Sequence, residues 1–291
     1  MVERKDLVAY GAEFLGTLMF QLIGGGQSAG LLNGLVLTVV VFCTAEYSGG
    51  HVNPAVTAGL VVGGEHPPVK GAIYAAMQLS GAFIGSLLTA GIFVTPITGT
   101  SSSGVSLPSP NIFKYEENKH GVSPDYMQGT GCAGPKKVII GLGQFLVPIT
   151  NDVSDGQVFG AEFFGTFLLV ATVFSAAVSK KFGNTAPIAI GLAILVAVGS
   201  CGTISGGAFN PARFFGPAIV WGCSVEKIWL YWLAELMAGA CAGLLWRFVQ
   251  KPIIDAQAQG EEKRSQDIEM AQTSIEMPHT SVSNEIHNPG A

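Results

Sequence analysis

The stretch that decides the fold is Gly49-Gly50-His51-Val52-Asn53-Pro54-Ala55-Val56, which returns as Gly206-Gly207-Ala208-Phe209-Asn210-Pro211-Ala212-Arg213. Each copy interrupts apolar sequence. Asn-Pro-Ala is typical of a helix start, because asparagine caps the first turn and proline tolerates a position whose N–H would have no partner. In a membrane protein, two such starts predict two half-helices whose positive ends point at one place.

The 291-residue chain has a membrane composition, with 48% hydrophobic and only 12% charged residues. Soluble domains carry about 25% charged residues. The net charge of −5 gives no indication of nucleic-acid binding. The five cysteines lack metal-ligand spacing, so we predict no metal site and no cofactor. No Ser/His/Asp set, catalytic carboxylate pair or phosphate loop stands out, which argues against an enzyme.

Apolar runs of the length that crosses a bilayer, about 20 residues each, recur along the chain. Six candidate spans cover residues 8–27, 31–47, 68–95, 158–179, 187–203 and 227–250. The pieces at 54–63 and 211–221 are too short to span and fit re-entrant half-helices, which exist only where protein or water surrounds them. We therefore predict an all-α membrane protein with six transmembrane helices and two re-entrant half-helices.

The two halves of the chain repeat each other. Residues 11–17, Gly-Ala-Glu-Phe-Leu-Gly-Thr, recur at 160–166 as Gly-Ala-Glu-Phe-Phe-Gly-Thr, and Asn210 follows Asn53 by 157 positions. Each half holds three spans and one half-helix. An odd number of spans per repeat forces an inverted topology, which places a site at the midplane between the repeats.

Basic residues flank the spans on one side, which by the positive-inside rule predicts that both termini are cytoplasmic. They are Arg4, Lys5, Lys70, Lys180, Lys181, Arg247 and Lys251. The same orientation makes the long loop 96–157 extracellular. We expect a channel-type domain over residues 1–251 and a polar, disordered cytoplasmic tail over residues 252–291.

The paired boxes, the Ala-Glu-Phe-x-Gly-Thr opening of each half and the six spans resemble the aquaporin (major intrinsic protein) family over residues 8–250. The resemblance implies a passive water channel that excludes protons and ions. It also implies a homotetramer with one pore per subunit, in a plasma or vacuolar-type membrane. The two boxes meet at mid-membrane, and their residues are Asn53, Pro54, Ala55, Asn210, Pro211 and Ala212.

Family spacing implies a selectivity filter, and its residues are Asn33, Val198, Gly207 and Arg213. A charged arginine at membrane depth should face a wet lumen. Strict water channels have an aromatic residue and a histidine where this chain has Asn33 and Val198. The filter therefore resembles that of plant tonoplast intrinsic proteins and ammonia-permeable animal aquaporins. Departures from glycerol facilitators at Phe214, Ala218 and Tyr231-Trp232 favour the water branch.

Glutamates within the predicted spans include Glu13, Glu162 and Glu235. For Glu13 and Glu162, one in each repeat, the resemblance implies a structural role, in which they hold the backbone of the re-entrant loops. Glu235 lies where the family usually has proline, and its repeat partner is Gln78. Two readings of Glu235 stay open: it braces a loop, or it is protonated.

Two alternatives to a water channel remain at this point. The first is a broader neutral-solute pore that passes ammonia, hydrogen peroxide, urea or glycerol. The second is a non-conducting membrane adhesion or scaffold protein, which only the long loop 96–157 supports.

Overall fold

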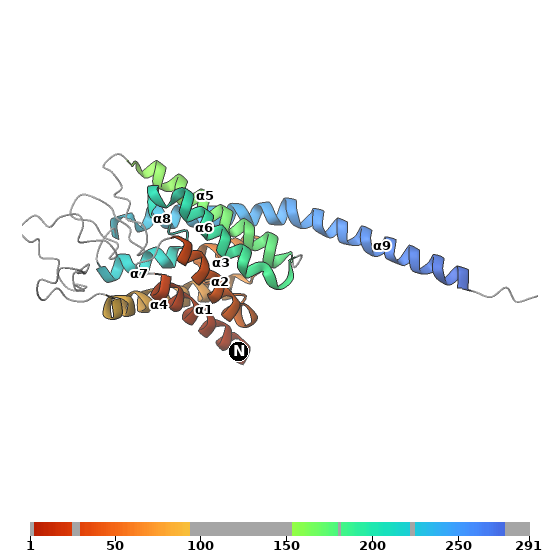
Figure 1. Ribbon diagram of the computed structural model, residues 1–291, viewed down its shortest axis with the longest axis horizontal. Helices are drawn as coiled ribbons and strands as arrows, with labels where there is room; N and C mark the ends of the chain where they lie inside the picture. The colour runs from red at the N-terminus through yellow and green to blue at the C-terminus, as the bar shows by residue number, and fades with distance from the viewer. Residues whose placement is uncertain (1–2, 25–29, 94–152, 180–181, 222–224, 277–291) are drawn as a thin grey trace, which may run out of the picture. The chain divides into compact units, whose positions relative to one another are not determined.

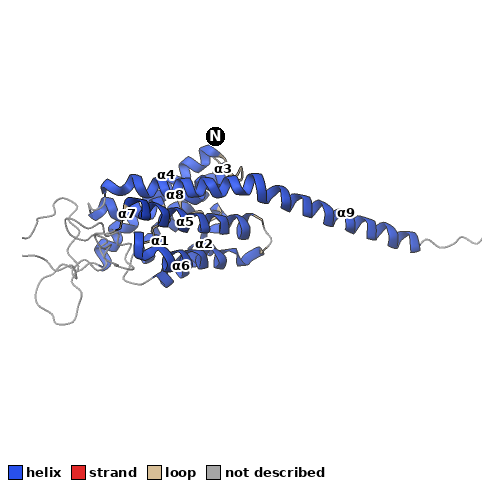
Figure 2. Ribbon diagram, turned by 90° about the horizontal axis from the view of Figure 1, so that it is seen from above, coloured by secondary structure: helices blue, strands red, loops and turns tan. Residues whose placement is uncertain are grey.

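The computed structural model describes residues 3–24, 30–93, 153–179, 182–221 and 225–276. The described elements are all helical, and no strand occurs among them (Figure 2). Contacts within the chain divide it into two units, with the boundary after Val249. Figure 1 labels the helices described below. The first unit is a helical bundle, and the second contains a single described helix.

The first repeat supplies four helices of the bundle. They are α1 (Arg4–Gly24), α2 (Gly30–Ser48), the short α3 (Pro54–Val62) and α4 (Pro68–Phe93).

The second repeat supplies the same succession of three long helices and one short helix. They are α5 (Asp155–Val173), α6 (Ala186–Ser205), the short α7 (Pro211–Trp221) and α8 (Ile228–Leu245). Single turns of π- or 3-10 helix flank these elements at Phe174–Val178, Gly183–Thr185, Val225–Lys227 and Trp246–Gln250.

The predicted fold class is confirmed. Five described helical stretches are long and apolar enough to cross a membrane, and Leu32–Ser48 forms a shorter apolar helix. The short helices α3 and α7 begin at Pro54 and Pro211, directly after the two asparagines. Large apolar side chains point outward from the long helices, as lipid-facing surfaces require, and examples are Leu15, Val39, Phe164 and Leu192.

Each half-helix packs against a long helix of the other repeat: α3 against α8, and α7 against α4. Glycine permits this close approach. A Cβ added to Gly239 would lie 2.2 Å from the Ala55 carbonyl oxygen, and one added to Gly216 would lie 2.5 Å from the Ala82 carbonyl oxygen. Such small-residue crossings are typical of membrane helix packing. The two repeats are therefore interlocked through their half-helices.

The first helix after the long loop begins earlier than expected. We predicted that the loop would run to residue 157, but α5 begins at Asp155. The reason is a capping box, in which the Ser154 hydroxyl accepts from the Gln157 amide while the Gln157 side chain accepts from the Ser154 amide. Residues 94–152, which include Cys132, lie outside the described residues.

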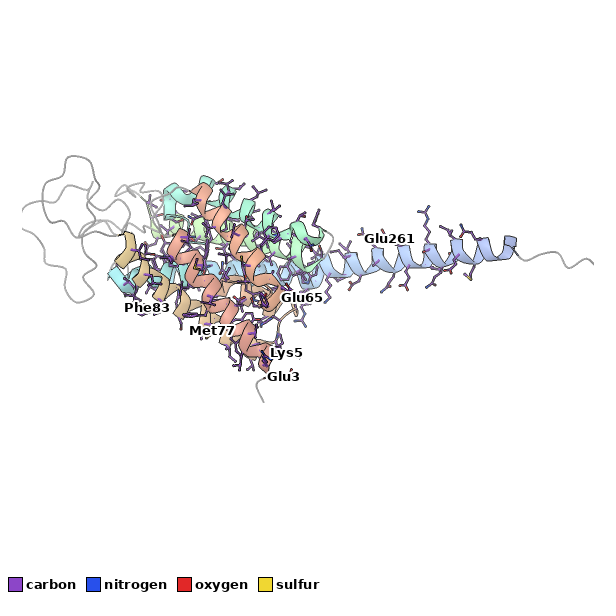
Figure 3. All side chains as sticks on the ribbon, turned by 60° about the horizontal axis from the view of Figure 1, so that its bottom comes forward. Glu3, Lys5, Glu65, Met77, Phe83 and Glu261 are labelled. Atoms are coloured by element: carbon purple, nitrogen blue, oxygen red, sulfur yellow. The ribbon has the colours of Figure 1, made fainter. Side chains whose placement is uncertain are left out.

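Residues 252–276, which we expected to be disordered, form most of helix α9 (Lys251–Glu276). The sequence is rich in alanine, glutamine and glutamate, which all have high helix propensity. Its side chains are mostly exposed, as for Glu261 in Figure 3. The low hydrophobicity of this segment indicated correctly that it has little apolar surface to bury. Low hydrophobicity alone does not exclude a helix, so the expectation of disorder was wrong for residues 252–276.

Candidate functional site

The two box asparagines cap the half-helices as their sequence predicts. Asn53 has extended backbone angles, and its side-chain oxygen accepts a hydrogen bond from the Ala55 amide at 2.8 Å. The Asn210 side-chain oxygen accepts from the amides of Ala212 at 3.0 Å and Arg213 at 3.3 Å. Each cap satisfies helix N–H groups that have no partner within the helix. Both side-chain oxygens are therefore committed to the helix starts.

The side-chain nitrogens of the same asparagines join the two repeats. Asn53 Nδ2 donates to the Phe209 carbonyl at 2.8 Å, and Asn210 Nδ2 donates to the Val52 carbonyl at 2.9 Å. A side-chain amide has two N–H donors. These crossed bonds use one of the two on each asparagine, and the second remains for another partner.

The carbonyls that accept these bonds belong to strained residues. Val52 has φ of +41° and Phe209 has φ of +50°, and these are the non-glycine residues with positive φ in the described parts of the chain. This backbone region is unfavourable for a β-branched or bulky residue. Such strain persists only where the surrounding contacts stabilise it, and it concentrates at functional sites.

Glu13 supplies those contacts in the first repeat. Its fully buried carboxylate accepts from the amides of His51 at 2.9 Å and Val52 at 2.7 Å. It also accepts from the Ser48 hydroxyl and the Gln78 side chain, each at 2.6 Å. The carboxylate on α1 thus contacts the loop, α2 and α4 together.

Glu162 is placed in the same way in the second repeat. It accepts from the amides of Ala208 at 3.0 Å and Phe209 at 2.7 Å, and from the Ser205 hydroxyl. The neighbouring Glu235 carboxyl accepts from the Asn210 amide at 2.9 Å. The structure thus places Glu13, Glu162 and Glu235 against the two box loops.

A cavity of about 640 Å³ leads to the asparagines from one end of the bundle. Its wall includes both box asparagines, His51 and Glu46, together with many apolar side chains. The cavity extends as far as Phe20 on α1, and its described lining contains none of the four predicted filter residues. Both asparagines thus line this cavity, and Phe20 lines it as well.

A ring cluster stands beside that cavity. The ring of His51 lies 4.8 Å from that of His66 and 5.0 Å from that of Tyr74, and His51 Nδ1 is 3.1 Å from the Thr57 hydroxyl. His66 follows α3, and burial together with the charge of Lys70 lowers the pKa of its imidazole. Figure 3 shows the neighbouring Glu65 at the end of the bundle where α1 begins.

Arg213 is almost fully buried, at 3% exposed, and two contacts hold its guanidinium. It donates to the Gly24 carbonyl at 3.3 Å and to the side-chain oxygen of Asn33. It also lies over the Phe20 ring, 4.5 Å from the centroid, in a cation–π contact. The structure therefore brings together Arg213 and Asn33, two of the four predicted filter residues.

The other two predicted filter residues, Val198 and Gly207, form a second pair. A Cβ added to Gly207 would lie 3.3 Å from a methyl carbon of Val198, and Gly207 itself has φ of +69°. A side chain at Gly207 would therefore be strained as well as crowded. This pair contributes an apolar surface without a side-chain hydrogen-bond donor.

Sequence reasoning missed Phe20 and Gly24, which contact Arg213. Both lie in an apolar helix where phenylalanine and glycine are ordinary residues, so no signal distinguished them.

The aromatic residues by which the sequence departs from glycerol facilitators make packing contacts in the structure. Phe214 stacks on Tyr231 with 4.1 Å between centroids, and Trp232 donates to the Pro211 carbonyl at 3.0 Å. Among the described residues, no group of three or more metal-ligating side chains gathers.

Comparisons with known proteins agree with this architecture. The family model for "Major intrinsic protein" matches residues 2–246. Probable aquaporin TIP2-2 of Oryza sativa subsp. japonica is 36% identical over 266 residues, which cover 84% of this chain and 88% of that protein. Aquaporin TIP2-3 of Arabidopsis thaliana is 35% identical over 264 residues, which cover 83% of this chain and 87% of that protein.

Among solved structures, the aquaglyceroporin from Plasmodium falciparum has the same fold. The match has a TM-score of 0.64 at 20% identity and covers 86% of this chain and 99% of that chain. Together the matches confirm the resemblance to aquaporins with tonoplast-type relatives, and proteins of this kind are transporters and not enzymes. The chain therefore belongs to the major intrinsic protein family of membrane channels.

Proposed function

We propose that the protein is a passive water channel that excludes protons and ions. The crossed bonds between Asn53, Asn210 and the opposite loop carbonyls carry this proposal. They hold both amides at the cavity wall, each with one N–H left for a passing water. A water that accepts from both amides cannot easily bridge its neighbours in the file. The positive ends of α3 and α7 add a barrier to cations and protons.

We assign the selectivity filter to Asn33, Val198, Gly207 and Arg213. Insertion of an arginine at membrane depth costs at least about 2.5–3.5 kcal/mol, which favours a position that a wet lumen reaches. Asn33 and the Gly24 carbonyl accept from its guanidinium, and this orients the charge. A positive group at this narrow place repels cations and can donate to the oxygen atoms of permeating molecules.

One observation favours a broader neutral-solute pore as the second candidate. The Val198 and Gly207 side of the filter is apolar and small, and Asn33 occupies the position of a bulky aromatic residue. Such a filter has room and few donors, so that ammonia, hydrogen peroxide, urea or glycerol could accompany water. Membership of a channel family disfavours the non-conducting adhesion or scaffold alternative.

For the assembly and its surroundings, we propose a homotetramer with one pore per subunit in a vacuolar-type or plasma membrane. The resemblance to tonoplast-type relatives favours the vacuolar membrane. The placement of lysine and arginine favours cytoplasmic termini, an extracellular or luminal loop 96–157, and a cytoplasmic tail after a channel domain over residues 1–251.

The test is stopped-flow light scattering on purified protein in liposomes, with water, glycerol and ammonia gradients. A Val198→Trp variant reconstituted at the same density is the control, because the large side chain should close the filter. Fast water flux with little solute entry supports the water channel, and fast entry of all three supports the broader pore. Water flux no higher than in protein-free liposomes or in the blocked variant would refute both.

A further inference from the structure

The two box loops have the same kind of support, with one chemical difference. Glu235 on α8 is fully buried, and its Oε1 accepts from the Asn210 amide. Its Oε2 is also buried and accepts no hydrogen bond from a described residue. That oxygen belongs to a carboxyl group that interacts directly with the Glu162 carboxylate. A buried oxygen without a donor, beside a second acid, requires an explanation.

The first repeat shows how such a loop is held. The Glu13 carboxylate has four donors: the Ser48 hydroxyl, the amides of His51 and Val52, and Gln78 Nε2. The fourth donor comes from the long helix α4 and carries no charge. All four hydrogen bonds are therefore available to an ionised carboxylate.

The second repeat keeps three of these four donors. The Ser205 hydroxyl and the amides of Ala208 and Phe209 contact Glu162. The position of Gln78 is taken by Glu235, which follows it by 157 positions, the spacing of the two asparagines. An ionised glutamate has no donor to offer. Two adjacent carboxylates away from water repel each other strongly, so that at least one of them holds a proton.

The Arg213 guanidinium attracts the Glu162 carboxylate electrostatically, but its described hydrogen bonds go elsewhere. Helix α3, which packs against α8, carries no titratable side chain. On α7, the Arg213 guanidinium donates to Gly24 and Asn33. On α8 itself, the Tyr231 hydroxyl donates to the Ser205 carbonyl at 2.7 Å. At the start of α5, Asp155 pairs with Lys227.

We propose that Glu235 is a protonated carboxylic acid that donates to Glu162 and accepts from the Asn210 amide. It is a positioning residue, because it acts on the pore through the loop that carries Asn210. The carboxyl pair then has one negative charge, as Glu13 and Gln78 have in the first repeat. The proton belongs to the support of the loop and lies outside the file of water molecules.

Infrared spectroscopy of the full-length protein in lipid tests the protonation directly. At neutral pH we expect the carbonyl stretch of a protonated carboxylic acid, which shifts when the glutamate is isotope-labelled. The substitution Glu235→Gln should remove this band, whereas Glu226→Gln, at an exposed glutamate of the same region, should leave it. A wild-type protein without such a band, or a band that survives Glu235→Gln, would overturn the proposal.

Water permeability provides the second readout, and this part rests on the proposed function. Glutamine keeps one donor and one acceptor, so Glu235→Gln should keep water permeability within about twofold of wild type. Glu235→Leu leaves the Asn210 amide without its acceptor and should reduce permeability by about tenfold. Equal loss in both variants would contradict a hydrogen-bonding role. If the wild-type protein conducts no water but shows the band, the proposed water-channel function is refuted, and the proposed protonation of Glu235 is still supported.

Discussion

The loops that carry Asn53 and Asn210 share their backbone support and differ in the side chains around it. In both, a buried glutamate accepts from two successive loop amides, and a tyrosine hydroxyl donates to the carbonyl of the last serine of the preceding helix. Several positions related by 157 residues differ, and they include His51 and Ala208, Thr57 and Phe214, and Gln78 and Glu235.

The comparison shows that the backbone and the side chains of the two loops are under different constraints. The backbone of each loop is strained and buried, so both copies need the same donors and acceptors whatever they face. The side chains vary because the surroundings vary. The first loop borders a wide cavity with polar rings, and the second leads to Arg213 and an apolar, aromatic environment. Backbone support is thus repeated in both loops, whereas the proposed selectivity filter lies on the side of the second loop.

Removal of either glutamate brace should have the largest effect. Glu13→Leu leaves the amides of His51 and Val52 unpaired, at a cost of about 1–3 kcal/mol for each buried group. We expect little monodisperse protein and a strongly lowered thermal unfolding midpoint in detergent. Glu162→Leu should be equally damaging, because Glu162 also accepts hydrogen bonds from two successive loop amides, those of Ala208 and Phe209. A stable, conducting Glu13→Leu protein would show that the repeated support is dispensable.

Arg213→Ala should change selectivity and leave the fold intact. Loss of the guanidinium enlarges the filter and removes its positive charge, so glycerol permeability should rise about tenfold, equivalent to about 1.4 kcal/mol of barrier. Liposome uptake of glycerol and of a monovalent cation measures the change. The matched control is Val56→Ala, at the corresponding position of the first repeat, which should leave selectivity unchanged. Unaltered selectivity in folded Arg213→Ala would place the filter elsewhere.

Val198→His should narrow the filter and add a polar ring. We expect water permeability to fall less than about threefold and glycerol permeability to fall about tenfold. Its counterpart in the first repeat is Val41, which lines the wide cavity, so Val41→His should affect both solutes weakly. The ratio of the two permeabilities in liposomes is the readout. An equal loss of all fluxes would contradict the placement of Val198.

The smallest expected effect concerns His66, whose ring packs with those of His51 and Tyr74 at the first loop. Among the described residues, the second loop has no corresponding cluster with histidine rings. Burial and Lys70 lower the pKa of His66 from 6.5, so the neutral form is favoured in the folded protein. Stability is therefore complete above pH 6.5 and decreases as the pH falls from 6.5 through the lowered pKa.

Because His66 is only partly buried, the change should be small. His66→Gln should raise the thermal unfolding midpoint by about 1 °C at about pH 5 and leave it unchanged at about pH 8. A shift of the same size at both pH values would indicate a packing effect.

The helix pattern and the two boxes were predictable because they rest on local physics. Asn53 and Asn210 mark helix starts, and the lengths of the apolar runs separate spans from half-helices. The proximity of Asn33 to Arg213 came from family spacing. In contrast, the contacts of Phe20 and the partners of Glu235 depend on how α1, α5 and α8 pack, which no local pattern encodes. Helix α9 was not predicted, because the polar composition of the tail was interpreted as a sign of disorder.

The crossed asparagine bonds also bear on how the channel is made. Each joins residues more than 150 positions apart, Asn53 to Phe209 and Val52 to Asn210. During synthesis the first loop emerges long before its partner exists. Until then the Val52 carbonyl and the Asn53 amide lack their final partners, and the strained loop lacks one of its supports. The centre of the channel is therefore completed only after the last helices are inserted, and a chain that stops before α7 cannot form it.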